Sequence, residues 1–86
     1  MESFHDTSEL FEVILKLKTK EDCAILFDDL CTKVEIAAME QRIKAAKLLK
    51  QGKTYEQVIS ETDISSATLS RVSKALKYGS GYKKFL

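Results

Sequence analysis

The spacing of apolar residues follows the period of an α-helix along most of the chain. Apolar side chains recur every three to four positions, the spacing that places them on one face of a helix. This pattern predicts helices over five ranges: residues 7–18, 20–31, 33–51, 55–61 and 65–77. The C-terminal tail, residues 78–86, contains two glycines and is expected to leave the helix. The expected fold class is therefore all-α.

Three of the predicted helices begin with a threonine that stands three residues before an acid or an amide. The pairs are Thr19 with Asp22, Thr32 with Glu35, and Thr54 with Gln57. At this spacing each side chain can satisfy a free backbone N–H group of the other residue. Asp22 fits the pattern less well, because glutamate or glutamine is usual at that position. Asp6 or Thr7 is expected to cap the first helix.

The first and third predicted helices carry more apolar surface than one small chain can bury. Apolar residues surround much of the first helix, at Leu10, Phe11, Val13, Ile14, Leu15 and Leu17. The third helix has two apolar rows, at Ile36, Met39, Ile43 and Ala46 and at Ala38, Ala45 and Leu49. Wide apolar faces that stay uncovered usually form oligomer interfaces. We therefore expect a helical homodimer with residues 1–53 as its dimerisation region; the alternative is a monomeric bundle that buries these helices.

The composition indicates one small helical domain. The chain has 86 residues, of which 44% are hydrophobic and 31% are charged, with three glycines, no proline and a net charge of +1. This length allows a single domain, residues 1–86, and the apolar content argues against disorder. No apolar run is long enough to cross a membrane, and the acidic N-terminus is unlike a secretory signal. We expect a cytoplasmic protein.

Residues that carry catalysis or bind metals are scarce. His5 is the one histidine, and it lies near the chain end, where fraying is expected. Cys23 and Cys31 on one helix would be about 12 Å apart, which is too far for a disulfide, and they lack the spacing of a zinc site. No glycine-rich phosphate loop is present. The sequence therefore predicts no enzyme, no metal site and no resident cofactor.

Charge is divided unevenly along the chain. Residues 1–31 contain eight acids and three lysines, whereas residues 32–86 contain eleven bases and five acids. From Ile64 onward the chain has five bases and no acid. A basic end of this kind is typical of a protein that binds a polyanion while its average charge stays near zero.

Residues 54–77 fit a helix-turn-helix, in which two short helices cross at a steep angle. Such a corner needs apolar residues at fixed positions on both helices. The candidates are Val58, Ile59, Ile64, Leu69, Val72 and Leu76. Asp63 stands at the turn position where glycine is commonest. Aspartate tolerates the left-handed conformation better than most residues, so the turn can form at some strain.

The other face of the second short helix is polar and basic. The residues expected to approach DNA are Ser65, Ser66, Ala67, Thr68, Ser70, Arg71, Lys74 and Lys77, and Ser73 is expected on the same face. Small and hydroxyl-bearing side chains at a helix start allow close approach to a major groove, and lysines neutralise phosphates. The expected partner is double-stranded DNA. The alternative is a helical protein-interaction module that binds a partner helix and leaves the basic end in solvent.

These segments resemble the tryptophan repressor superfamily, in particular its shorter YerC/YecD branch. The resemblance rests on residues 67–72 (ATLSRV), 30–32 (LCT), 41–43 (QRI), 48–52 (LLKQG), 78–79 (YG) and 81–82 (GY). It covers roughly residues 8–82. The resemblance implies an intertwined helical homodimer that presents two helix-turn-helix units to a palindromic operator and acts as a transcriptional repressor. Half-sites would then lie about 34 Å apart.

The resemblance also implies where a small effector would bind. Relatives that bind tryptophan hold its indole ring between two arginines, at positions that correspond to Arg42 and Arg71. Thr32 corresponds to the threonine that opens their long helix. Those relatives have glycine and serine where this chain has Val72 and Ala75. Valine intrudes on the indole pocket and alanine lacks a hydroxyl for the ammonium group, so the exchange argues for a different small effector or none.

Arg42 is unusual on its own spacing. It follows Ala38 by four positions and precedes Leu49 by seven, within an apolar row. An arginine there lays its aliphatic part along apolar surface, pairs with an acid such as Asp28 or Asp29, or faces a ligand. The sequence leaves these three interpretations open.

Overall fold

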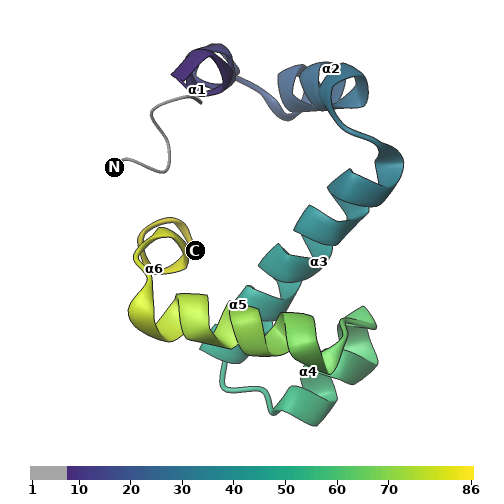
Figure 1. The fold of residues 1–86 in the computed structure, drawn as a ribbon, viewed down its shortest axis with the longest axis vertical. Coiled ribbons are helices and arrows are strands. Elements are labelled where there is room, and N and C mark those ends of the chain that lie inside the picture. The colour runs from purple at the N-terminus through teal and green to yellow at the C-terminus, as the bar shows by residue number, and fades with distance from the viewer. Residues whose placement is uncertain (1–7) are drawn as a thin grey trace. The chain divides into compact units, whose positions relative to one another are not determined.

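The computed structural model describes residues 8–86, and every regular element in this range is an α-helix (Figure 1). The expected all-α fold class is confirmed. The chain divides into two compact units, Met1–Lys33 and Val34–Leu86. None of the helices in the described range combines the length and the apolar character needed to cross a membrane. The residues expected to cap the first helix, Asp6 and Thr7, lie outside the described range.

The first unit contains α1 (Ser8–Ile14) and α2 (Lys20–Leu30). α1 is shorter than the predicted range 7–18. After Ile14 the chain continues in turns, in which the N–H groups of Lys16 and Leu17 donate to carbonyls three residues earlier, at 3.0 Å. Thr19, which caps α2, is extended, with φ −132° and ψ 166°. The Thr19 hydroxyl accepts from the N–H of Asp22 at 3.0 Å, as expected. The Asp22 carboxylate accepts from the N–H of Lys18 at 3.0 Å instead of from that of Thr19, so the reciprocal bond expected for this pair is not formed. These bonds hold the chain outside a helix just before α2.

The helices of the first unit leave their apolar side chains uncovered. No residue of α1 or α2 is buried. Leu15, in the turn after α1, is 83% exposed, and Ile25 on α2 is 70% exposed. Leu10, Phe11, Val13 and Leu30 are exposed as well. The amphipathic pattern of these helices therefore has no core of its own in a single chain.

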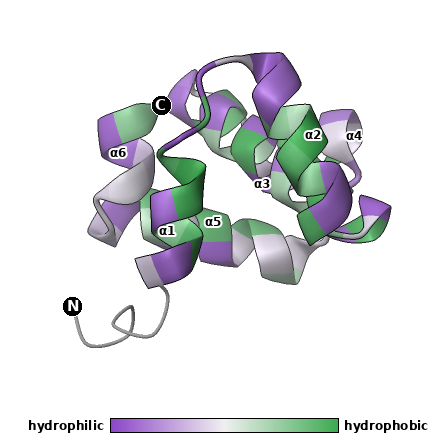
Figure 2. Ribbon diagram, turned by 90° about the horizontal axis from the view of Figure 1, so that it is seen from above, coloured by the Kyte–Doolittle hydropathy of each residue, from purple (hydrophilic) through white to green (hydrophobic). Residues whose placement is uncertain are grey.

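The second unit contains a complete hydrophobic core. Its helices are α3 (Lys33–Lys50), α4 (Tyr55–Thr62), α5 (Ser66–Tyr78) and α6 (Gly81–Phe85), and α3 to α5 each begin and end within one residue of the predicted limits. The core consists of Ala45, Ala46, Val58, Ile64, Leu69 and Val72. Four of these were expected at the corner, where Ile59 and Leu76 are half-buried. Figure 2 shows hydrophobic and hydrophilic residues alternating along the helices, as expected for helices with one buried face.

The C-terminal residues form a short helix that the apolar spacing did not predict. The chain leaves α5 at Gly79, as expected, and the N–H of Gly79 donates to the carbonyl of Ala75 at 2.9 Å. A Cβ at Gly79 would lie 2.7 Å from that same oxygen, so only glycine fits. The chain then turns into α6 instead of continuing as an irregular tail.

Two kinds of contact hold α6 in place. The Nζ atom of Lys83 donates to the carbonyl of Lys77 at 2.7 Å. Tyr82 and Leu86, four residues apart, pack against the core. This segment is too short for a helical period to be visible in its sequence, and its helix depends on these tertiary contacts.

Candidate nucleic-acid interface

The corner formed by α4 and α5 begins with a reciprocal pair of hydrogen bonds. The Thr54 hydroxyl accepts from the N–H of Gln57 at 3.2 Å, and the Gln57 side chain accepts from the N–H of Thr54 at 2.9 Å. The capping box predicted from the sequence is therefore present. Val58 follows directly and is fully buried, so the first turn of α4 is fixed by its cap and by the core.

The turn between the two helices takes the backbone conformation expected at Asp63. This residue is left-handed, with φ 59° and ψ 18°, and its N–H donates to the carbonyl of Ile59 at 2.9 Å. Ile64 follows the turn and is 2% exposed. A buried isoleucine beyond a left-handed residue pulls the chain back onto the core, which sets the sharp angle between α4 and α5.

Two of the residues expected to approach DNA also build the start of α5. The Ser65 hydroxyl accepts from the N–H of Thr68 at 3.1 Å and donates to the Thr68 hydroxyl at 2.9 Å. Thr68 is half-buried, whereas Ser65 is exposed. These bonds satisfy one of the free N–H groups at the helix start, so the first role of this pair is to fix where α5 begins.

The outer face of α5 carries a continuous exposed stripe. Its members, which we call the α5 stripe, are Ala67, Ser70, Arg71 and Lys74. They are spaced at i, i+3, i+4 and i+7, which is the spacing of neighbours on one helix face. Leu69 and Val72 lie on the opposite side and are buried. Ser66 and Lys77 are exposed beside the stripe, but Ser73 is half-buried and lies nearer the core than expected.

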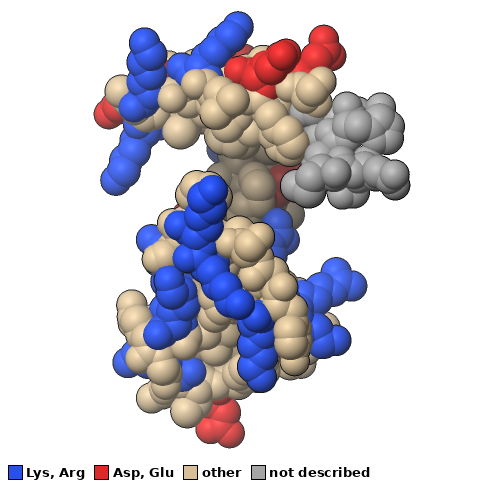
Figure 3. Space-filling model, turned by 90° about the vertical axis from the view of Figure 1, so that its left-hand side faces the viewer, with Lys and Arg blue, Asp and Glu red and all other residues tan. Residues whose placement is uncertain are grey.

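The basic groups of this region have no acidic partners in their own unit. Arg71, Lys74 and Lys77 make no hydrogen bond or ion pair through their side chains within residues 34–86. Lys44 on α3, by contrast, lies 3.8 Å from Glu40. The lower part of Figure 3 shows one face of the second unit, on which lysine and arginine side chains gather and acids are nearly absent. This face is suited to a polyanion.

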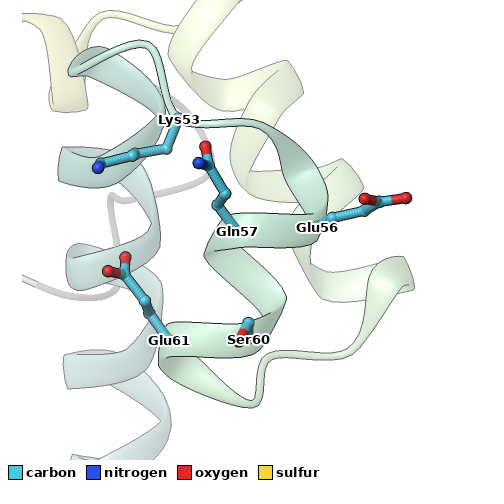
Figure 4. A pocket seen from close by; sticks show the side chains of 5 residues that line it. All are labelled: Lys53, Glu56, Gln57, Ser60 and Glu61. Atoms are coloured by element: carbon cyan, nitrogen blue, oxygen red, sulfur yellow. The ribbon is translucent and has the colours of Figure 1, made fainter.

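A shallow hollow lies on α4, and none of its lining residues belongs to the α5 stripe. It is lined by Lys53, Glu56, Gln57, Ser60 and Glu61 (Figure 4). Figure 4 shows Lys53 and Glu61 reaching to the same side of α4, while Glu56 points away from them. The lining is polar and the hollow is open, whereas small-molecule sites are concave with apolar walls. The hollow contains none of the residues predicted to bind an effector.

The three effector candidates do not fall in one unit. Thr32 belongs to the first unit, and Arg42 and Arg71 belong to the second. Arg42 is half-buried on α3 and makes no side-chain hydrogen bond or ion pair within its unit, whereas Arg71 is exposed. Val72 is 2% exposed, so the valine that departs from the tryptophan-binding pattern is part of the core.

Sequence reasoning missed two features of this region. The Nε2 atom of Gln41 on α3 donates to the carbonyl of Thr62 at the end of α4, at 2.9 Å. Tyr78, assigned to the tail, is the last residue of α5 and is 84% exposed, four positions beyond Lys74. A polar amide among the half-buried positions of α3 was the available signal for Gln41, but its partner is a backbone carbonyl that leaves no mark in the sequence.

Comparison with known proteins places the chain among its relatives. A family model described as Trp repressor protein matches residues 5–86. "Uncharacterized protein YerC" from Bacillus subtilis (strain 168) is 46% identical over 74 residues, which cover 86% of this chain and 71% of that protein.

Two solved structures match as well. The crystal structure of a "putative Trp repressor" from Staphylococcus aureus is 46% identical with a TM-score of 0.84, and the match covers 87% of this chain and 76% of that one. A TrpR-like protein from Eubacterium eligens ATCC 27750 is 36% identical with a TM-score of 0.92, covering 98% and 90% of the two chains. These matches agree with the resemblance visible in the sequence. The chain belongs to the Trp repressor family.

Proposed function

We propose that this protein is a sequence-specific DNA-binding transcriptional regulator, a repressor that binds a palindromic operator as a homodimer. The observation that carries the proposal is the α5 stripe, an exposed row of small, hydroxyl-bearing and basic side chains on a helix whose other face is locked into the core. Family membership supports the same conclusion, because the matching family model is described as Trp repressor protein.

The α5 stripe and its neighbours divide into two roles. Ser66, Ala67 and Ser70 are short, so the start of α5 can enter a major groove and reach base edges or a thymine methyl group. The free N–H groups at the same helix start favour phosphate oxygens. Arg71, Lys74 and Lys77 neutralise phosphates, and Ser65 with Thr68 holds the helix start in shape.

The uncovered apolar side chains support the homodimer. Leu15, Ile25 and Val34 are 83%, 70% and 79% exposed, and no residue of α1 or α2 is buried. A second copy of the chain can cover these faces, because each copy offers the same apolar surface to the other. Two copies would carry two α5 stripes, as a palindromic operator requires.

We propose that any effector of this protein differs from tryptophan. Val72 fills the core beside Arg71, and Ala75 offers no hydroxyl to an ammonium group. Addition of L-tryptophan is therefore expected to leave the affinity for DNA unchanged in a titration followed by fluorescence anisotropy. An increase of tenfold or more would contradict this proposal.

The proposal is tested by binding to duplex DNA across a salt series. We expect affinity for random duplex at ~50 mM salt that falls as a power of the salt concentration. Absence of such binding would favour the alternative, a module that binds a partner helix. Arg71→Ala then separates two roles: loss of DNA affinity indicates direct contact, whereas loss of repression with intact affinity indicates an effector site.

A further inference from the structure

A hydrogen bond joins the middle of α3 to the turn of the helix-turn-helix. The Nε2 atom of Gln41 donates to the carbonyl of Thr62 at 2.9 Å, and the two residues are 21 positions apart in the chain. Both are half-buried. Thr62 is the last residue of α4, and carbonyls at the end of a helix have no partner within that helix. Gln41 supplies the missing donor from a different helix.

The other polar groups at this bend are satisfied locally. The Thr62 hydroxyl donates to the carbonyl of Val58 at 2.7 Å and accepts from the N–H of Ile64 at 3.3 Å. Asp63, between them, donates its N–H to Ile59. These bonds fix the shape of the turn, but they do not attach it to α3. The hydrogen bond from Gln41 joins the turn to α3, alongside the packing of Val58 and Ile64 in the same core as Ala45 and Ala46.

We propose that Gln41 is a positioning residue for DNA recognition, whose bond to Thr62 sets the placement of the α4–α5 corner against α3. The inference rests on the proposed function, because it assumes a dimer that binds DNA. α3 belongs to the region expected to form the dimer, so the placement of the corner on α3 determines the distance between the two α5 stripes. That distance sets which half-site spacing the protein prefers.

The geometry shows why one bond matters for spacing. α4 has eight residues, which gives a length of about 12 Å. The start of α4 is joined to α3 by the short connection that contains Gly52. The end of α4 is joined to α3 by the hydrogen bond from Gln41. Without this hydrogen bond, the end of α4 is held on α3 by the apolar contacts of the core, which are not directional. A rotation of ~15° would move the turn and the start of α5 by ~3 Å, close to the rise of one base pair.

The sequence offers a matched set of variants. Gln41→Glu keeps the size of the side chain but removes its donor, and Gln41→Met removes its polarity without adding charge. Gln57→Glu is the control, since Gln57 uses its side-chain oxygen as an acceptor and glutamate keeps that acceptor. The two glutamate variants make the same change in net charge, although only one loses its bond.

The operator is first identified by selection from a pool of random duplexes. The experiment then measures the affinity of each variant for duplexes that carry this operator, with its half-site spacing changed by one base pair in either direction. We expect the unaltered protein and Gln57→Glu to prefer one spacing. Both Gln41 variants are expected to lose about fivefold of that preference, the effect of one hydrogen bond. The unfolding temperature of each variant is measured alongside.

Two outcomes would overturn the inference, and they are distinct. If both Gln41 variants lower the unfolding temperature but keep the spacing profile of the unaltered protein, the bond is structural only. If the unaltered protein binds no duplex, the proposed function fails first, and the inference fails with it. Gln41→Met remains informative where the half-buried carboxylate of Gln41→Glu prevents folding.

Discussion

The two units of this chain differ in whether they bury their apolar side chains. The second unit buries six residues in a core that it forms alone, whereas no residue of the helices in the first unit is buried. Both sets of helices are amphipathic, so the difference does not lie in local pattern. It lies in whether the surface that covers each apolar face comes from the same chain.

The units also differ in charge. Met1–Lys33 contains eight acids and four lysines, whereas Val34–Leu86 contains ten bases and five acids. The charge of the second unit favours association with a polyanion, whereas the charge of the first unit opposes it. The comparison indicates two tasks in one small chain: the acidic, apolar part suits association with another copy, and the basic part with its own core suits a polyanion.

The largest expected effect is on the core of the second unit. Leu69→Ala removes a fully buried side chain and is expected to lower the free energy of unfolding by about 3 kcal/mol. Because this core lies within one chain, the loss should be the same at every protein concentration. Urea unfolding measures it, and a loss below ~1 kcal/mol would contradict the description of this core.

A smaller effect is expected at the apolar surface of the first unit. Leu15 is 83% exposed in a single chain, so Leu15→Asp would change little in a monomer. In a dimer that covers this surface, the carboxylate is expected to raise the dissociation constant at least tenfold, about 1.4 kcal/mol. Analytical ultracentrifugation measures the constant, with the neighbouring polar substitution Lys16→Asp as the control. An unchanged constant would remove Leu15 from the interface.

The charge difference predicts a change in salt dependence. Lys74→Ala is expected to lower the exponent that relates DNA affinity to salt concentration by about 0.9, because one phosphate is no longer neutralised by a lysine. Lys18→Ala, an exposed lysine of the first unit, is expected to leave the exponent unchanged. Equal effects of the two substitutions in a fluorescence titration would show that the two units do not differ in their approach to DNA.

The smallest effect concerns the turn. Asp63→Gly relieves a left-handed residue with φ 59° and is expected to raise the free energy of unfolding by about 0.5 kcal/mol. The reverse type of exchange, Gly52→Ala at φ 89°, is expected to lower it by ~1 kcal/mol. Thermal unfolding checks both, and stabilisation by the second exchange would show that these backbone conformations are not strained for ordinary residues.

Much of the second unit could be predicted from the sequence because its signals are local. The cap at Thr54, the left-handed Asp63 and the inner row of α5 each depend on residues within a few positions of one another. The α5 stripe follows from the same periodicity, since fixing the buried face also fixes the exposed one. Seven of the eight residues expected to approach DNA are exposed, and the eighth, Thr68, is half-buried.

What the sequence did not reveal depends on contacts between distant positions. α6 forms because Tyr82 and Leu86 meet the core, and Gln41 finds its partner in a backbone carbonyl of another helix. The hydroxyls of Ser65 and Thr68, expected to approach DNA, also bond to each other. α1 ends at Ile14, where the chain changes to turns that its apolar pattern does not mark. None of these outcomes follows from spacing alone.

The central claim is that two copies of the α5 stripe meet a duplex together, and selection from a pool of random duplexes tests it most directly. Fragments retained by the unaltered protein are sequenced and aligned. The account predicts a palindrome whose half-sites lie about one helical turn apart, ~34 Å. Retained fragments without a shared sequence, or with a single unpaired half-site, would contradict it.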